Sequence, residues 1–248
     1  MKKIILLLSL LLYGLYGYSQ DATEIVRKAD QKMRGESSYS EMLMKIVRPN
    51  WSREISMKSW SYGSEYALIL VTAPAREEGI AFLKRGNEIW NWQPSIDRVV
   101  KMPPSMMGQS WMGSDFTNDD LVRESSVIHD YTHTLLGDST IDGREAYKIQ
   151  LTPKEDAAVV WGKVIMFVSK DDYLQLLTRF YDEDMYLMHS IAGHSVRQMD
   201  DRLLTSVMEV IPAEEEDQKT VMEYKSIDFD IDISPEFFSV QQMKKIRP

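Results

Sequence analysis

Apolar and polar positions alternate with a period of two along most of the chain. Met42, Met44 and Ile46 show this alternation, and it returns over residues 53–62 and in many later segments. Successive side chains of a strand point to opposite faces of a sheet, so the pattern predicts half-buried β-strands. We expect about eleven strands joined by tight turns. Because no long helices alternate with them, the pattern favours an antiparallel barrel or a strongly curved sheet in a mainly β protein with a few helices.

Three helices are expected beside these strands. Residues 21–34 place Ile25, Val26, Ala29 and Met33 on one face, with Asp21 as a predicted N-cap. A capping box at 117–120 predicts a short central helix. Ser234 and Pro235 predict the start of a short C-terminal helix.

The segment 102–120 combines apolar side chains with chain-breaking residues. It contains four methionines, Trp111 and Phe116 together with two prolines and two glycines. Such a stretch forms neither a good strand nor a long helix, and methionine repacks around varied shapes. We therefore expect a mobile apolar lid, with Gly108 and Gly113 as hinges, over a cavity inside the curved sheet.

Residues of the lid and of the strands are the candidates for ligand contact. For any one of them, ordinary core packing is the alternative. Trp90 and Trp92 share one face of a predicted strand. The full set of expected ligand-binding residues is Met44, Met57, Trp90, Trp92, Met106, Met107, Trp111, Met112 and Phe116.

The first residues have the pattern of a cleaved signal peptide. Lys2 and Lys3 precede an apolar core from Ile4 to Leu12, and small residues lead to a cut after Ser19. We expect residues 1–19 to be the signal peptide and 20–248 to be a single domain. The core is shorter than the ~20 residues of a membrane span, which makes an anchor the less favoured interpretation.

Charge and cysteine content narrow the classes of function. The formal net charge of −9 becomes −11 once Lys2 and Lys3 are removed, which argues against nucleic acid and anionic membrane surfaces as partners. There is no cysteine, so neither disulfides nor a lipid-modified cysteine is expected.

No catalytic or metal motif has a specific pattern. His129 and His133 are four apart, but their β-branched and aromatic surroundings predict a strand, on which such residues lie ~13 Å apart. The acidic run from Asp115 lacks the glycine and glutamate of a calcium loop. No nucleophile or phosphate-loop motif is present. We expect no enzyme, metal or cofactor, and keep a metal-dependent hydrolase at the two histidines as a further alternative.

Two motifs carry a resemblance to a known family. They are Ile89-Trp90-Asn91-Trp92 and the run from Ser105 to Asp120, SMMGQSWMGSDFTNDD. The chain from about Asp21 onward resembles bacterial outer-membrane lipoprotein-sorting-like proteins, relatives of the LolA/LolB fold. The resemblance implies a half-open barrel whose lid of short helices carries Trp111, Met112 and Phe116. It also implies an arginine that helps to latch the lid, which the sequence alone does not place.

The resemblance also implies a function. We expect a monomeric periplasmic protein that binds the acyl chains of lipoproteins or lipids and passes them between membranes, or to and from a permease such as an RND-type exporter. The alternative is a non-catalytic accessory protein of such an exporter, in which the cavity is only a packed core.

Overall fold

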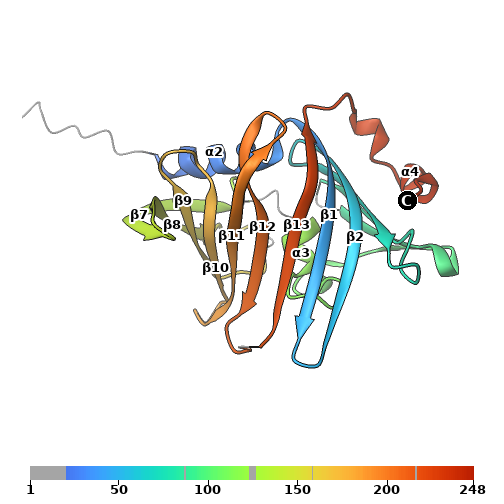
Figure 1. The fold of residues 1–248 in the computed structure, drawn as a ribbon, viewed down its shortest axis with the longest axis horizontal. Helices are drawn as coiled ribbons and strands as arrows, with labels where there is room; N and C mark the ends of the chain where they lie inside the picture. Colours follow the sequence, from blue (N-terminus) through green and yellow to red (C-terminus); the bar gives the residue numbers. More distant parts are fainter. Residues whose placement is uncertain (1–20, 87, 123–126, 158, 216) are drawn as a thin grey trace, which may run out of the picture.

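A single curved antiparallel sheet dominates the computed structural model, which describes residues 21–86, 88–122, 127–157, 159–215 and 217–248. Its thirteen strands are ordered β6-β5-β4-β3-β2-β1-β13-β12-β11-β10-β9-β8-β7 (Figure 1). The predicted signal peptide lies outside the described residues. The predicted curved antiparallel architecture is confirmed, although the sheet has more strands than the expected eleven.

The strands are β1 (Ser37–Arg48), β2 (Trp51–Tyr62), β3 (Tyr66–Ala73), β4 (Ala81–Arg85), β5 (Glu88–Gln93), β6 (Arg98–Lys101), β7 (Tyr131–Ile141), β8 (Arg144–Pro153), β9 (Lys163–Ser169), β10 (Gln175–Tyr181), β11 (Leu187–Met199), β12 (Arg202–Pro212) and β13 (Lys219–Phe229). The α-helices are α2 (Ala22–Arg34), α3 (Asn118–Val122) and α4 (Val240–Lys245). Short 3₁₀ turns are η2 (Pro94–Ile96), η3 (Pro104–Met106) and η5 (Pro235–Phe237). No helix in the described part of the chain is long and apolar enough to cross a membrane.

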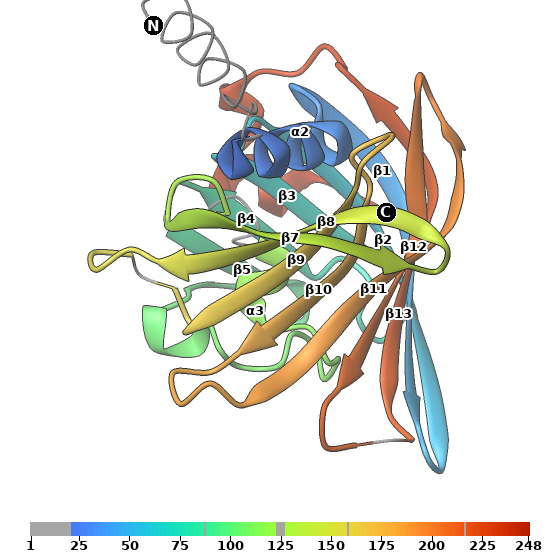
Figure 2. The same ribbon diagram turned by 90° about the vertical axis from the view of Figure 1, so that its left-hand side faces the viewer.

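Helix α2 follows the amphipathic pattern predicted for it. The Asp21 carboxylate accepts a hydrogen bond from the Thr23 amide at 2.9 Å, and Gly35 ends the helix at a φ of 69°. Its apolar face, with Ile25 and Val26 buried, packs into a cluster with Ile149 and Leu151 of β8. Figure 2 shows α2 lying across one end of the curved sheet.

The segment between β6 and β7 joins the two opposite edges of the sheet, because β6 and β7 are its first and last strands. It carries η3 and α3, and Figure 2 shows α3 within the curve of the sheet. The predicted capping box is present: the Asp120 carboxylate accepts from the Thr117 amide at 2.8 Å, and the Thr117 hydroxyl accepts from the Asp120 amide at 3.1 Å. We call residues 102–120 the lid.

The C-terminal segment covers part of the convex face of the sheet. Ser234 and Pro235 begin only the turn η5, and a separate helix α4 starts after Ser239, whose hydroxyl accepts from the Gln242 amide at 3.2 Å. The expected short C-terminal helix is confirmed as α4, but its predicted start at Ser234 is wrong, since a second cap at Ser239 divides the segment. Phe238 and Met243 are fully buried against β3 and β4.

Candidate ligand-binding site under the lid

Buried apolar side chains of the lid fill the concave side of the sheet. Met107, Trp111 and Phe116 are at most 4% exposed. Around them lies one continuous group, which we call the lid cluster. Its buried members are Met42, Met44, Ile46, Ile55, Met57, Ile69, Val71, Phe82, Ile89, Met107, Trp111, Phe116, Val210 and Met222.

Strand register explains why the methionines of the sheet meet the lid. Met44 of β1 pairs with Ile55 of β2 on one side and Met222 of β13 on the other. Met42 pairs with Met57 on the same face. Because side chains two residues apart share a face, these rows form one continuous apolar wall. The Trp111 ring packs against Phe82 of β4 at a tilt of 50°, with the ring centroids 5.1 Å apart.

The lid is held together by its own hydrogen bonds. The Trp111 amide donates to the Phe116 carbonyl at 2.8 Å, and the Asp119 amide donates to the Met107 carbonyl at 3.0 Å. The Asn118 side-chain amide donates to the Met106 carbonyl at 2.9 Å. Gly113 has a φ of 79°, which suits the tight turn between these segments, whereas Gly108 does not have a left-handed backbone. These bonds make the lid a compact plug with its own internal hydrogen bonds.

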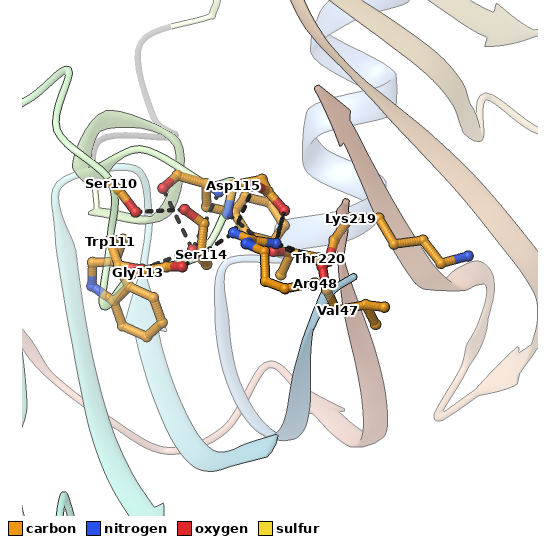
Figure 3. A network of polar contacts seen from close by, with 10 residues as sticks. Val47, Arg48, Ser110, Trp111, Gly113, Ser114, Asp115, Lys219 and Thr220 are labelled. Carbon is orange, nitrogen blue, oxygen red and sulfur yellow. Dashed lines mark hydrogen bonds and ion pairs between the residues drawn. The ribbon is translucent and has the colours of Figure 1, made fainter. Parts of the chain in front are cut away.

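A polar network at Asp115 ties this plug to the sheet (Figure 3). Arg48, at the end of β1, donates to both carboxylate oxygens of Asp115 at 2.9 and 3.0 Å, and to the Gly113 carbonyl at 3.2 Å. Thr220 of β13 donates to the same carboxylate at 2.7 Å and accepts from the Asp115 amide at 3.0 Å. Two-point contact of this kind is both strong and geometrically specific. We call this network the latch.

Most of the expected ligand-binding residues come together in this cluster. Met44, Met57, Met107, Trp111 and Phe116 are buried members, and Met106 and Met112 pack against it. Trp90 and Trp92 do not join them. They point to the convex face, where they pack in the cluster of Phe238 and Met243. The expected grouping of the two tryptophans with the lid is therefore corrected. Side chains alternate between the two faces along β5, and Ile89 is the residue that joins the lid cluster.

A small cavity of about 120 Å³ lies beside the lid cluster. It is lined mainly by apolar side chains, with Phe116, Asp119 and Asp120 contributed by the lid. The cavity is continuous with the lid cluster, because Met42, Phe116 and Met222 belong to both.

Two buried ionisable groups meet at the rim of this cavity. The carboxylate of Asp120 lies 3.8 Å from the Nε2 atom of His189 on β11. Burial raises the pKa of Asp120 to about 6 and lowers the pKa of His189 to about 4. The His189 ring stacks on Phe180, with centroids 4.6 Å apart, and meets Trp161 edge-on at 5.0 Å. At pH 7 this corner holds a neutral imidazole beside a largely ionised carboxylate.

The two histidines considered for a metal site have other surroundings. His133 of β7 contacts the Val127 carbonyl at 2.7 Å and the Thr23 hydroxyl at 3.2 Å through its two ring nitrogens. His129 lies in the turn before β7, not on the strand that was expected to hold both. The described residues contain no group of three or more His, Asp or Glu side chains that could hold a metal ion.

Arg48, Asp120 and His189 are the residues that sequence reasoning did not assign to the site. Arg48 is one of 29 lysines and arginines, and its partner Asp115 follows 67 residues later. Asp115 and Asp120 carried a signal, since both lie in the motif of the resemblance.

A family model described as "-like: Uncharacterized protein" matches residues 63–245 of the chain. The chain belongs to this family. Comparison with curated proteins finds no match. The matched range includes the lid and every strand from β3 onward.

Solved structures establish a LolA-like fold. A DUF1329 family protein from Desulfovibrio piger has a TM-score of 0.81 at 23% identity, over 90% of this chain and 97% of that one. A putative outer membrane lipoprotein-sorting protein domain from Vibrio parahaemolyticus has a TM-score of 0.80 at 20% identity, over 90% and 98%. A LolA superfamily protein from Nitrosomonas europaea has a TM-score of 0.78 at 20% identity, over 90% and 99%. The fold expected from the sequence resemblance is confirmed.

Proposed function

We propose that this protein is a non-catalytic periplasmic carrier of acyl chains from lipoproteins or lipids. The observation that carries the proposal is the arrangement of the lid: a compact apolar plug, fastened at the latch, fills the concave face of a half-open sheet. A plug of this kind can be exchanged for another apolar body of similar volume. The fold shared with a lipoprotein-sorting protein domain and a LolA superfamily protein supports the same function.

The free energies of the exchange are of comparable size. Withdrawing Met107, Trp111 and Phe116 from the sheet costs ~1.5–3 kcal/mol for each side chain. Breaking hydrogen bonds to charged groups at the latch adds ~1.5–3 kcal/mol for each. A buried acyl chain returns ~0.8 kcal/mol for every methylene, so about a dozen methylenes offset the withdrawal of the three side chains, and a longer or a second chain is needed to offset the latch as well.

The closed state carries one local cost that favours exchange. The indole N–H of Trp111 is buried and has no hydrogen-bond partner among the residues that the structure describes. A buried unsatisfied donor costs ~1–3 kcal/mol, which is recovered when the group reaches water or a polar ligand atom. This local cost lowers the free energy needed to open the lid.

The predicted signal peptide supports export to the periplasm, where acylated cargo would pass between membranes or to and from a permease such as an RND-type exporter. A second role, that of an accessory protein of such an exporter without carrier activity, remains the alternative. It predicts that the lid cluster stays packed in all states and that protein purified without detergent carries no lipid in native mass spectrometry.

Substitution of the latch tests the carrier proposal. Arg48→Gln removes the two-point contact with Asp115, which shifts the lid toward the open state. Each ~1.4 kcal/mol of opening free energy changes apparent affinity about tenfold. We expect Arg48→Gln to bind a fluorescent fatty acid several-fold faster or more tightly than the parent.

Arg144→Gln is the matched control. Arg144 forms an ion pair of 3.1 Å with Asp172 in the β8–β9 region, away from the lid. This variant should bind the fluorescent fatty acid as the parent does. Equal binding by the parent and both variants would contradict a lid that gates access, and absence of binding in all three would favour the accessory role.

A further inference from the structure

The interior wall of the sheet changes character along its length. Toward the lid, the paired inward positions of β1 and β2 are Met42–Met57 and Met44–Ile55. Toward helix α2, the next two inward pairs are Ser40–Ser59 and Ser38–Ser61. The hydroxyls of Ser38 and Ser61 lie 2.7 Å apart and share a hydrogen bond. Four consecutive rows of one face therefore pass from apolar to hydroxyl-bearing.

A lysine lies on the same inward face. Lys84 of β4 follows Phe82 of the lid cluster by two residues and is 4% exposed. Its ammonium group donates to the Ser64 carbonyl at 2.7 Å, which holds the group at the cavity wall. The ammonium group and the hydroxyls of Ser38, Ser40, Ser59 and Ser61 therefore lie along one cavity wall.

These residues line a second cavity of about 100 Å³ under α2. Its charged lining residues are Lys84, Arg34 and Asp30, of which Arg34 and Asp30 form an ion pair of 3.0 Å. The ammonium group of Lys84 and the serine hydroxyls are all hydrogen-bond donors on the wall of this cavity. Charge-assisted hydrogen bonds from such donors favour an anionic acceptor.

This polar cavity adjoins the apolar one. Asp30, Met42, Gln175 and Tyr224 line both, so the two cavities meet at these residues. We propose that the serine and Lys84 cavity is a binding site for the anionic head group, phosphate or carboxylate, of a single amphiphile whose chain lies under the lid. This inference rests on the proposed carrier function and adds to it the chemical class of the cargo.

The test compares amphiphiles that share a twelve-carbon chain and differ only in the head. Dodecyl phosphate, dodecanoate and dodecyltrimethylammonium each displace the neutral fluorophore N-phenyl-1-naphthylamine from the full-length mature protein. We expect the two anions to act at a concentration at least tenfold below that of the cation. The better of the two anions then distinguishes a phosphate head from a carboxylate head.

Lys84→Met keeps the aliphatic stem and removes the charge. We expect it to reduce the preference for anions to about twofold or less, with displacement by the cation unchanged or improved. Lys45→Met is the matched control, because Lys45 is exposed on the opposite face of β1, where it pairs with Glu54 at 3.3 Å. It should keep the full preference.

Ser59→Val keeps the inference testable if Lys84→Met does not fold. The larger apolar side chain retains the ammonium group and takes the space of the head group, so anion binding alone should weaken. Equal displacement by all three heads in the parent would overturn the head-group site while leaving the carrier function standing. Displacement by none of them would contradict the carrier function itself.

Discussion

Asp120 and His189 are a buried acid and base whose pKa values shift in opposite directions. For Asp120 the folded value of about 6 exceeds the ordinary 3.8, so between these values the folded state holds a proton that the unfolded state has lost. Its contribution to stability therefore falls as the pH rises from 3.8 to 6. For His189 the folded value of about 4 lies below 6.5, so its contribution falls as the pH drops from 6.5 to 4. The two dependences oppose each other in the same window.

Single substitutions should separate these two effects. Asp120→Asn keeps an acceptor for the Thr117 amide and removes the buried charge, so we expect a gain of roughly 2–3 kcal/mol near pH 7 that disappears toward pH 4. His189→Gln should show the reverse, with a gain near pH 4 and little change at pH 7. Urea unfolding at pH 4, 5, 6 and 7 measures both. Parallel pH profiles for the parent and both variants would contradict the assignment.

At single positions, the sequence predicted which side chains are buried but not which residues they contact. The period of two marked Met44 and Met57 as inward residues, and both are buried under the lid. The same period could not tell which face Trp90 and Trp92 occupy, because the sheet is apolar on both sides near β5. Lys84 was not predicted to be an inward residue. It directly follows the short apolar segment 80–83, and a charged residue in that place resembles an ordinary strand end.

Among the elements, the C-terminal segment stabilises the fold from the convex face and lies apart from the proposed ligand site. Phe238 is fully buried on the convex face, with its ring 5.6 Å from that of Tyr66. Phe238→Ala should lower the free energy of unfolding by ~3–5 kcal/mol through the cavity it leaves. Binding of a fluorescent fatty acid to the folded fraction should not change, because the lid lies on the other face.

Chemical denaturation and binding measured on the same sample test this prediction. Tyr186→Ala is the control, since Tyr186 is 70% exposed and its loss should change stability by less than ~0.5 kcal/mol. Loss of fatty-acid binding in a folded Phe238→Ala protein would show that the convex cluster belongs to the site.

Elements with local signals were predicted well. Helix α2 has its cap and apolar face in consecutive residues, and the hairpin at Asp142-Gly143 has the two positive φ angles, 49° and 79°, that this dipeptide favours. The edge strand β7 has a weak signal, because its residues are mostly polar and only Tyr131 is buried. The division of the C-terminal segment depends on which of two serines caps a helix, which local pattern does not decide.

At the scale of the whole molecule, the decisive contacts are distant in sequence. Strand β1 pairs with β13 at positions such as Met44 and Met222, which joins the two halves of the sheet around the lid. Alternation and turn spacing predicted a curved antiparallel sheet, and the apolar, chain-breaking segment 102–120 predicted the lid that the family resemblance also implies. Neither indicated that Arg48 of β1 meets Asp115 of the lid. Neither indicated that serines of β1 and β2 lie with Lys84 of β4 at one polar end of the concave face, because that grouping depends on how the strands are paired.

The central claim is that an acyl chain occupies the concave face in place of the lid side chains. The most direct test is photo-crosslinking with a fatty acid that carries a diazirine near the end of its chain, followed by mass-spectrometric mapping of the labelled residues. The carrier account predicts labels on inward residues of β1 and β2, such as Met44 and Met57, and on the lid at 106–116, all competed by unlabelled fatty acid. Labels confined to the convex face around Trp92 and Phe238, or labels that unlabelled fatty acid does not reduce, would contradict it.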